Sequence, residues 1–166
     1  MKVLGIDPGI ARLGWGIVEQ KVGKYTAPGF GCVTTSKQDS PEKRLVVLFR
    51  RLQQIIKRYK PEVMAVEDLF FASNAKTAFQ VGQARGVALL TAALKNLPAA
   101  NYSPLKIKMS IVGYGRAEKS QVQQMVISVL KLKKAPKLDD TADALAVALT
   151  HLFTHKFEEK IRKSGK

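Results

Sequence analysis

Cysteine is nearly absent from this chain, and long apolar runs are missing altogether. One cysteine, Cys32, occurs in 166 residues, so no intrachain disulfide can form and a small buried thiol is the expected role. No apolar run approaches the roughly 20 residues that a membrane span requires. The first residues also lack the pattern of a secretory signal. We therefore expect a protein without a membrane association that stays in the cytoplasm.

Acidic residues are also scarce. The chain has 13 Asp and Glu against 28 Lys and Arg, which gives a net charge of +15 and a pI near 10.1. Such an excess predicts a polyanionic partner. The basic residues are spread along the chain and not gathered in a tail, which favours a folded surface for nucleic acid over a membrane anchor. Solvated helix faces rich in lysine are the simpler alternative.

No internal repeat and no Gly/Ser-rich or Pro-rich linker divides the sequence. A chain of this length can bury its own core. We therefore predict one domain over residues 1–157, followed by a basic, flexible tail over 158–166.

Apolar periodicity predicts an α/β fold. Strands are expected over 2–7, 13–20 and 25–35 as an antiparallel meander, over 62–67, and within 101–112; helices are expected from Pro41 to Lys60 and over 75–97, 116–132 and 139–153. This order indicates a mixed five-stranded sheet with helices on both faces. Gly14 and Gly16 leave one face of the second strand bare, so another element is expected to approach that backbone closely.

Two of the predicted strands end on a carboxylate. Asp7 follows the apolar run of the first strand and Glu67 ends the run "EVMAVE"; if these strands are neighbours, both side chains emerge at one sheet edge. Asp140 and Asp143 are three residues apart at a helix start, so they share a helix face. Helix capping alone would also account for acidic residues at this position, including Asp139.

Four clustered carboxylates repel one another unless cations neutralise them. Carboxylate oxygens select Mg²⁺ or Mn²⁺ over zinc. Two such ions can activate water and stabilise the leaving oxygen in phosphodiester hydrolysis. A basic protein with an all-carboxylate site is therefore a candidate nuclease.

Four segments together resemble one known family. "GIDPG…LGWG", "VEDLFFASNAKTAFQVGQARG", "VGYGRAEKSQVQQMV" and "DDTADALAVALTH" are similar to the RuvC family of Holliday junction resolvases, which have the ribonuclease H-like fold. The resemblance extends from the first residue to about residue 155. It implies that Asp7, Glu67, Asp140 and Asp143 are catalytic carboxylates that hold two Mg²⁺ ions, for which Mn²⁺ can substitute, while Asp139 is an additional neighbour that caps the helix.

The same resemblance assigns roles to three further residues. Lys119 in "AEKSQV" and Lys108 in "IKMSIVG" match basic residues near the scissile phosphate, with Lys119 counted among the catalytic groups. Phe70, three residues after Glu67, matches an aromatic side chain that stacks on bases at the opened crossover. A position in the hydrophobic core is the alternative for Phe70.

The resemblance implies an endonuclease that cuts two strands of a four-way junction and leaves 5′-phosphate and 3′-hydroxyl ends, in recombination and repair in the bacterial cytoplasm. Two symmetric cuts require two active sites, which predicts a homodimer, with the helix carrying Gly82 and Gly86 as the candidate interface. The RuvAB branch-migration complex is the implied partner. Two alternatives remain open: a related nuclease acting on RNA or RNA–DNA hybrids, and a junction-binding protein without activity.

Overall fold

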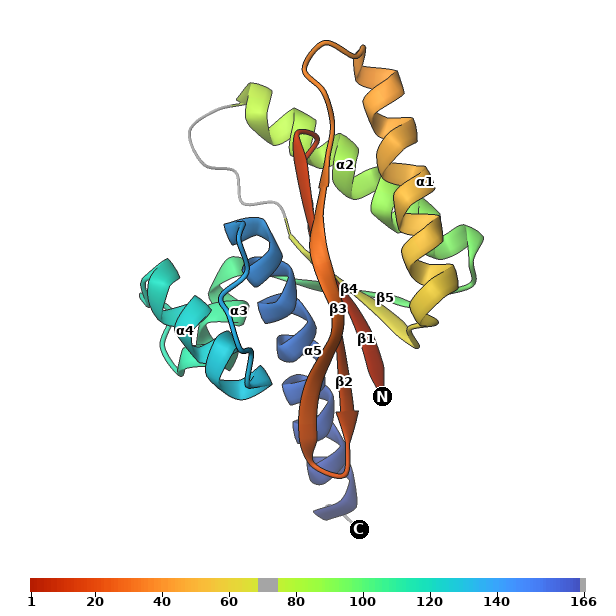
Figure 1. Ribbon diagram of the computed structural model, residues 1–166. Helices are drawn as coiled ribbons and strands as arrows, with labels where there is room; N and C mark the ends of the chain where they lie inside the picture. The colour runs from red at the N-terminus through yellow and green to blue at the C-terminus, as the bar shows by residue number, and fades with distance from the viewer. Residues whose placement is uncertain (69–74, 165–166) are drawn as a thin grey trace.

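The structure is a computed structural model that describes the backbone of residues 1–68 and 75–164 and the side chains of residues 1–68 and 78–155. Its elements are β1 (Lys2–Asp7), β2 (Arg12–Lys21), β3 (Lys24–Thr34), α1 (Pro41–Tyr59), β4 (Val63–Glu67), α2 (Ala75–Leu94), β5 (Ala99–Tyr102), α3 (Pro104–Val112), α4 (Lys119–Leu130) and α5 (Asp139–Ser164). Figure 1 shows the sheet between two groups of helices.

The sheet has the order β3-β2-β1-β4-β5. β1, β2 and β3 form the predicted antiparallel meander, and β4 pairs in parallel with both β1 and β5. This arrangement confirms the mixed five-stranded sheet with helices on both faces that is expected of a ribonuclease H-like fold.

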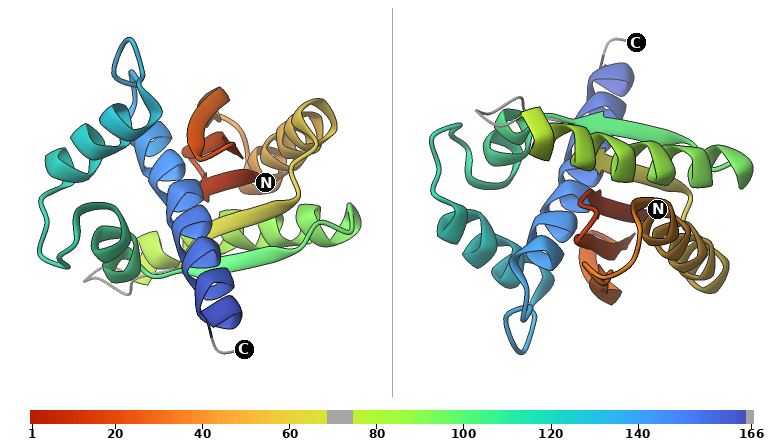
Figure 2. Two further views of the ribbon diagram at one scale, coloured as in Figure 1. Left: turned by 90° about the horizontal axis from the view of Figure 1, so that it is seen from below. Right: turned by 90° about the horizontal axis from the view of Figure 1, so that it is seen from above.

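Alternation along the strands builds a separate core on each face of the sheet. Val3 and Val18 pack with residues of α3, α4 and α5 on one face. Leu4 and Ile17 pack with residues of α1 and α2 on the other. Figure 2 shows α5 and α1 on opposite sides of the strands.

Glycines let α5 lie directly on β1 and β2. A Cβ atom on Gly14 would stand 1.9 Å from the backbone oxygen of Asp140, and one on Gly5 would stand 2.0 Å from that of Ala144. The element expected at the bare face of the second strand is therefore the first part of α5. The close approach brings the acidic end of α5 to the sheet.

The predicted strand within residues 101–112 is wrong in its extent. β5 is four residues long and ends at Tyr102, and α3 begins at Pro104. Ser103 is the N-cap, because its side chain accepts a hydrogen bond from the Lys106 backbone N–H at 3.2 Å. Ile107 and Ile111, four residues apart, are the buried residues of this helix.

The last helix is longer than predicted. α5 continues to Ser164, so its backbone includes most of the segment 158–166 that we assigned to a flexible tail. The sequence places Glu158 and Glu159 four residues before Arg162 and Lys163, a spacing that favours helix. No helix among the described residues is both long and apolar enough to cross a membrane.

Candidate active site

Asp7 and Glu67 lie side by side at one edge of the sheet. The parallel register pairs Ile6 with Val66, so the residues that follow them are also neighbours. Each carboxylate is two residues beyond a strand residue, Gly5 or Ala65, that faces α5, and alternation therefore directs both toward α5. The structure thus brings together the two strand-end carboxylates, as expected from the sequence.

These two side chains are hydrogen-bonded to each other. Burial, and then the charges of Asp143 and Asp140, raise the pKa of Asp7 to about 7. Burial, and then the charge of Asp7, raise the pKa of Glu67 to about 8. A hydrogen bond between two carboxyl groups requires that one of them be protonated, so the pair shares one proton. Near neutral pH the pair therefore retains a proton that exposed carboxylates would have lost.

The first turns of α5 add two more carboxylates. Asp143 forms an ion pair with Lys119, with 2.7 Å between Asp143 Oδ2 and Lys119 Nζ. Burial raises the pKa of Asp143 and outweighs the opposing effect of Lys119. Asp140 lies beside Arg12, with 3.3 Å between Asp140 Oδ2 and Arg12 Nε. The charges of both α5 residues act on Asp7, so the four predicted carboxylates converge on one region.

The donor set suits a hard divalent cation. Asp140 Oδ2 is buried and accepts no hydrogen bond, since the nearby Arg12 Nε is not aligned for one. A buried carboxylate oxygen without a hydrogen bond is costly, and a cation would remove that cost. Within residues 1–68 and 78–155, no three Asp, Glu, His or Cys side chains are grouped tightly enough to hold an ion as they stand. Lys119 and Arg12 each form an ion pair with one of these carboxylates, Asp143 and Asp140 respectively.

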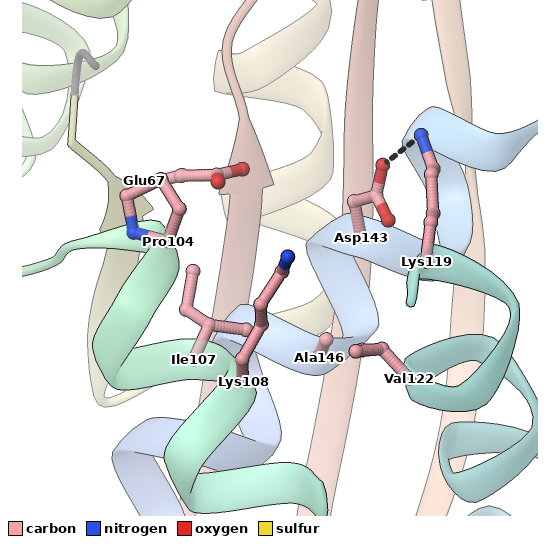
Figure 3. A pocket seen from close by; sticks show the side chains of 8 residues that line it. All are labelled: Glu67, Pro104, Ile107, Lys108, Lys119, Val122, Asp143 and Ala146. Atoms are coloured by element: carbon pink, nitrogen blue, oxygen red, sulfur yellow. Dashed lines mark ion pairs between the residues drawn. The ribbon is translucent and has the colours of Figure 1, made fainter. Parts of the chain in front are cut away.

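A pocket of about 290 Å³ opens beside these carboxylates. Figure 3 shows Glu67 and Asp143 on opposite sides of it, with the amino group of Lys108 pointing into the space between them. Pro104, Ile107, Val122 and Ala146 form its apolar lining. A phosphate group in this space would therefore meet both acidic groups that can hold metal and basic groups that can balance its own charge.

Comparison with known proteins shows the family of this chain. Residues 3–151 match the family described as "Crossover junction endodeoxyribonuclease RuvC". The chain belongs to the RuvC family. It is 48% identical over 165 residues to the crossover junction endodeoxyribonuclease RuvC of Clostridioides difficile, covering 99% of this chain and 98% of that protein. It is 50% identical over 151 residues to the RuvC of Moorella thermoacetica, covering 91% and 90%.

A solved RuvC structure supports the same assignment. The structure of T. thermophilus RuvC in complex with Holliday junction substrate matches with a TM-score of 0.90 and 38% identity, covering 95% of this chain and 96% of that one. The resemblance recognised in the four sequence segments is therefore confirmed over nearly the whole chain.

The two lysines singled out by the RuvC resemblance both line the pocket. Lys119 is the first residue of α4, and it lies 2.7 Å from Asp143 and 3.8 Å from Asp139. Burial lowers the pKa of Lys119, but its hydrogen bond to Asp143 and the surrounding carboxylates raise that pKa overall. Lys119 is thus a cation held among carboxylates. Lys108 comes from α3, on the opposite wall.

Two other sequence-derived assignments have different outcomes. Phe70 lies outside the described residues, so its proposed stacking role stays a prediction. Asp139 is the first residue of α5, and its side chain is 70% exposed. Its charge acts to raise the pKa of both Lys119 and Asp143. Asp139 therefore also acts on side chains of the site, which a capping role alone would not require.

Sequence reasoning missed two arginines. Arg12, beside Asp140, comes just after the turn that follows Asp7, a position from which a side chain can return to the carboxylates. Arg85 of α2 donates from Nη2 to Asp68 Oδ1 at 2.8 Å and to Asn101 Oδ1 at 2.9 Å. Because Asp68 directly follows Glu67, Arg85 holds the end of the strand that carries a predicted catalytic carboxylate. Nothing in the local pattern "GQARG" indicates this long-range contact.

Proposed function

We propose that this chain is a metal-dependent endonuclease that resolves four-way DNA junctions by paired nicks. The observation that carries the proposal is the convergence of Asp7, Glu67, Asp140 and Asp143 beside a pocket that also contains Lys108 and Lys119. Membership of a family of crossover junction endodeoxyribonucleases supports DNA as the substrate. We place the activity in the bacterial cytoplasm, where the chromosome is.

The four carboxylates would hold two divalent cations, Mg²⁺ by preference, with Mn²⁺ able to substitute. When bound, these ions supply an activated water and neutralise the departing 3′ oxygen, which leaves 5′-phosphate and 3′-hydroxyl ends. The Asp7–Glu67 pair would have to give up its shared proton before both carboxylates of the sheet edge could serve as ligands.

The two lysines supply the positive charge that the phosphate needs. If Asp143 held a cation, the Lys119 ammonium would be available to pair with a phosphate oxygen at the same wall of the pocket. Lys108 approaches from the other wall, so the scissile group is held between two cations. Phe70, which comes three residues after Glu67, would stack on a base at the crossover.

Paired nicking requires a homodimer, and α2 is the candidate interface. Phe79, Gly86, Leu90 and Leu94 recur at helical spacing, and the three large apolar side chains are 69%, 55% and 59% exposed in that order. A Cβ atom on Gly86 would meet nothing within 4 Å. An apolar stripe of this kind is suited to a second copy of the chain. A branch-migration complex of the RuvAB type remains the proposed partner of the dimer.

The decisive experiment uses a labelled immobile four-way junction, with an RNA–DNA hybrid duplex as the comparison substrate. We expect paired nicks in the junction only when Mg²⁺ or Mn²⁺ is present, and slower or no cutting of the hybrid. Asp7→Asn should abolish cleavage while junction binding in EDTA is retained. Full-rate cleavage by this variant would refute the assignment of the site, and preferred cutting of the hybrid would refute the substrate.

A further inference from the structure

The outward face of α1 carries a set of basic side chains that the active site does not use. The helix contains six Lys and Arg and a single acidic residue, Glu42. Solvated helix faces usually mix the two signs, because opposite charges one turn apart stabilise the helix. The outward face of α1 instead carries mostly positive charges, while the other face of the helix is buried in the core.

Four of these cations form two parallel rows. Arg50 and Lys57 are seven residues apart, and so are Arg51 and Arg58, so each pair repeats after two helical turns. All four are exposed. None of them makes an ion pair with a side chain in residues 1–68 or 78–155, although Arg51 donates to Gln54 Oε1 at 3.2 Å and Arg58 lies 5.2 Å from the Tyr59 ring centroid. We call these four residues and Gln54 the α1 ridge.

A hollow lies on each side of the α1 ridge. Arg50 and Lys57 line a groove of about 540 Å³ together with Lys60 and Lys95. Arg51 and Arg58 line another of about 260 Å³, whose floor includes the Trp15 and Tyr59 rings, 5.8 Å apart. Gln54 lines both hollows. The ridge therefore projects between two concave surfaces that are each bordered by unpaired cations.

We propose that the α1 ridge docks in the groove of duplex DNA, in an arm of the junction whose crossover occupies the active site. A helix is roughly 10 Å across and the major groove of B-DNA about 12 Å wide. The two cation rows lie about 100° apart around the helix axis, one on each side of its outward face, so each row can face one of the two phosphate backbones. An acidic peptide would need only one hollow, so the paired arrangement favours a duplex. The inference rests on the proposed function only for the identity of the substrate.

The sheet connects the α1 ridge to the catalytic residues over a short path. Cys32, which lines the smaller hollow, pairs with Gly14 in the sheet. Gly14 in turn packs against the backbone of Asp140. Because β3 is the edge strand, an arm leaving the active site can pass around this edge to α1, which Figure 2 shows on the other side of the sheet. DNA held at the crossover would present its arms to the ridge at high effective concentration.

The test measures binding in EDTA, so that no DNA is cut. One variant neutralises the first row (Arg50→Gln with Lys57→Gln) and a second neutralises the other (Arg51→Gln with Arg58→Gln). The control removes two exposed charges from the β2–β3 hairpin (Lys21→Gln with Lys24→Gln). Junctions with arms of about 25 base pairs are compared with junctions whose arms are too short to reach α1, over a range of salt concentrations. Thermal unfolding verifies that each variant is folded.

On long arms, each row variant should lower the slope of log affinity against log salt by about 1.8, because two phosphate contacts are lost. Affinity should fall roughly tenfold at low salt. The difference from the unmodified protein should vanish on short arms, and the hairpin control should show no such dependence on arm length. Four results would each overturn the proposal: no change in either row variant, a change in only one row, an equal loss on short arms, or the same loss in the control.

Discussion

Charged side chains are arranged differently on the two faces of the sheet. On the α5 face, carboxylates are buried beside one another, and Lys119 and Arg12 lie against them. On the opposite face, the four cations of the α1 ridge are exposed and make no ion pairs with the described side chains. The net charge of +15 is therefore unevenly distributed. Four of the 13 acidic residues converge on the α5 face, whereas α1 carries six basic residues and one acidic residue. We expect substitutions on the first face to change chemistry and those on the second to change DNA affinity.

The largest effect should follow from removing a carboxylate of the sheet edge. Glu67→Gln keeps the shape of the side chain but removes a proposed metal ligand, and we expect cleavage to fall by about 10³-fold or more, since a metal contributes several kcal/mol to the transition state. Single-turnover cleavage of a junction measures this. The Arg50→Gln, Lys57→Gln variant is the counterpart on the other face. If it lost cleavage of saturating DNA as severely as Glu67→Gln does, the division between the faces would fail.

Adding a side chain where α5 contacts β2 should destabilise the protein. In Gly14→Ala the new methyl group would overlap the backbone oxygen of Asp140, so α5 must shift, and we expect unfolding free energy to fall by about 3 kcal/mol. Urea denaturation measures the change. The matched control is Gly86→Ala, compared at a protein concentration at which the chain is monomeric so that the proposed α2 interface does not contribute. Within the chain that site has open space, and alanine is favoured over glycine in helices. A cost for Gly14→Ala no larger than that for Gly86→Ala would contradict the close packing of α5.

Much of this architecture could be predicted because it follows from local patterns. The strand-end positions of Asp7 and Glu67, and the three-residue spacing of Asp140 and Asp143, are visible in the sequence. The bare face of the second strand indicated a close neighbour. Local patterns did not separate β5 from α3, because the apolar residues of "LKIKMSIV" suit either element and Ser103–Pro104 decides in favour of the helix. Partners from distant segments, such as Arg85 with Asp68, follow only from the tertiary fold.

The stability of the protein should depend on pH because of the buried carboxylates on the α5 face. The pKa values of about 7 for Asp7 and about 8 for Glu67 lie above those of an unfolded chain, near 3.9 and 4.3. The folded state therefore binds more protons, and the stability present at low pH is lost as pH rises through the folded values. We expect the metal-free protein to lose on the order of 2 kcal/mol between pH 5 and pH 8. Urea unfolding in EDTA at several pH values measures this loss.

The control for the pH series is the double variant Asp7→Asn, Glu67→Gln. It keeps every other titratable group, so any slope that remains in it belongs to those groups. Its stability should change less with pH than that of the unmodified protein. Adding Mg²⁺ at pH 8 should restore stability to the unmodified protein and not to the double variant. Equal slopes in the two proteins would show that the carboxylate pair is not the source.

The smallest effect should come from Arg85, which contacts neither a carboxylate of the site nor the pocket. It ties α2 and β5 to Asp68, and so positions Glu67 from the α1 and α2 side of the sheet. We expect Arg85→Gln to reduce cleavage about tenfold, as is usual when a group that orients a metal ligand is lost, and to raise the Mg²⁺ concentration needed for half-maximal rate. Arg85→Lys, which can keep one ion pair, should recover part of this loss. A change in junction affinity with an unaltered Mg²⁺ requirement would instead place Arg85 on the DNA-binding surface and break the link between α2 and the site.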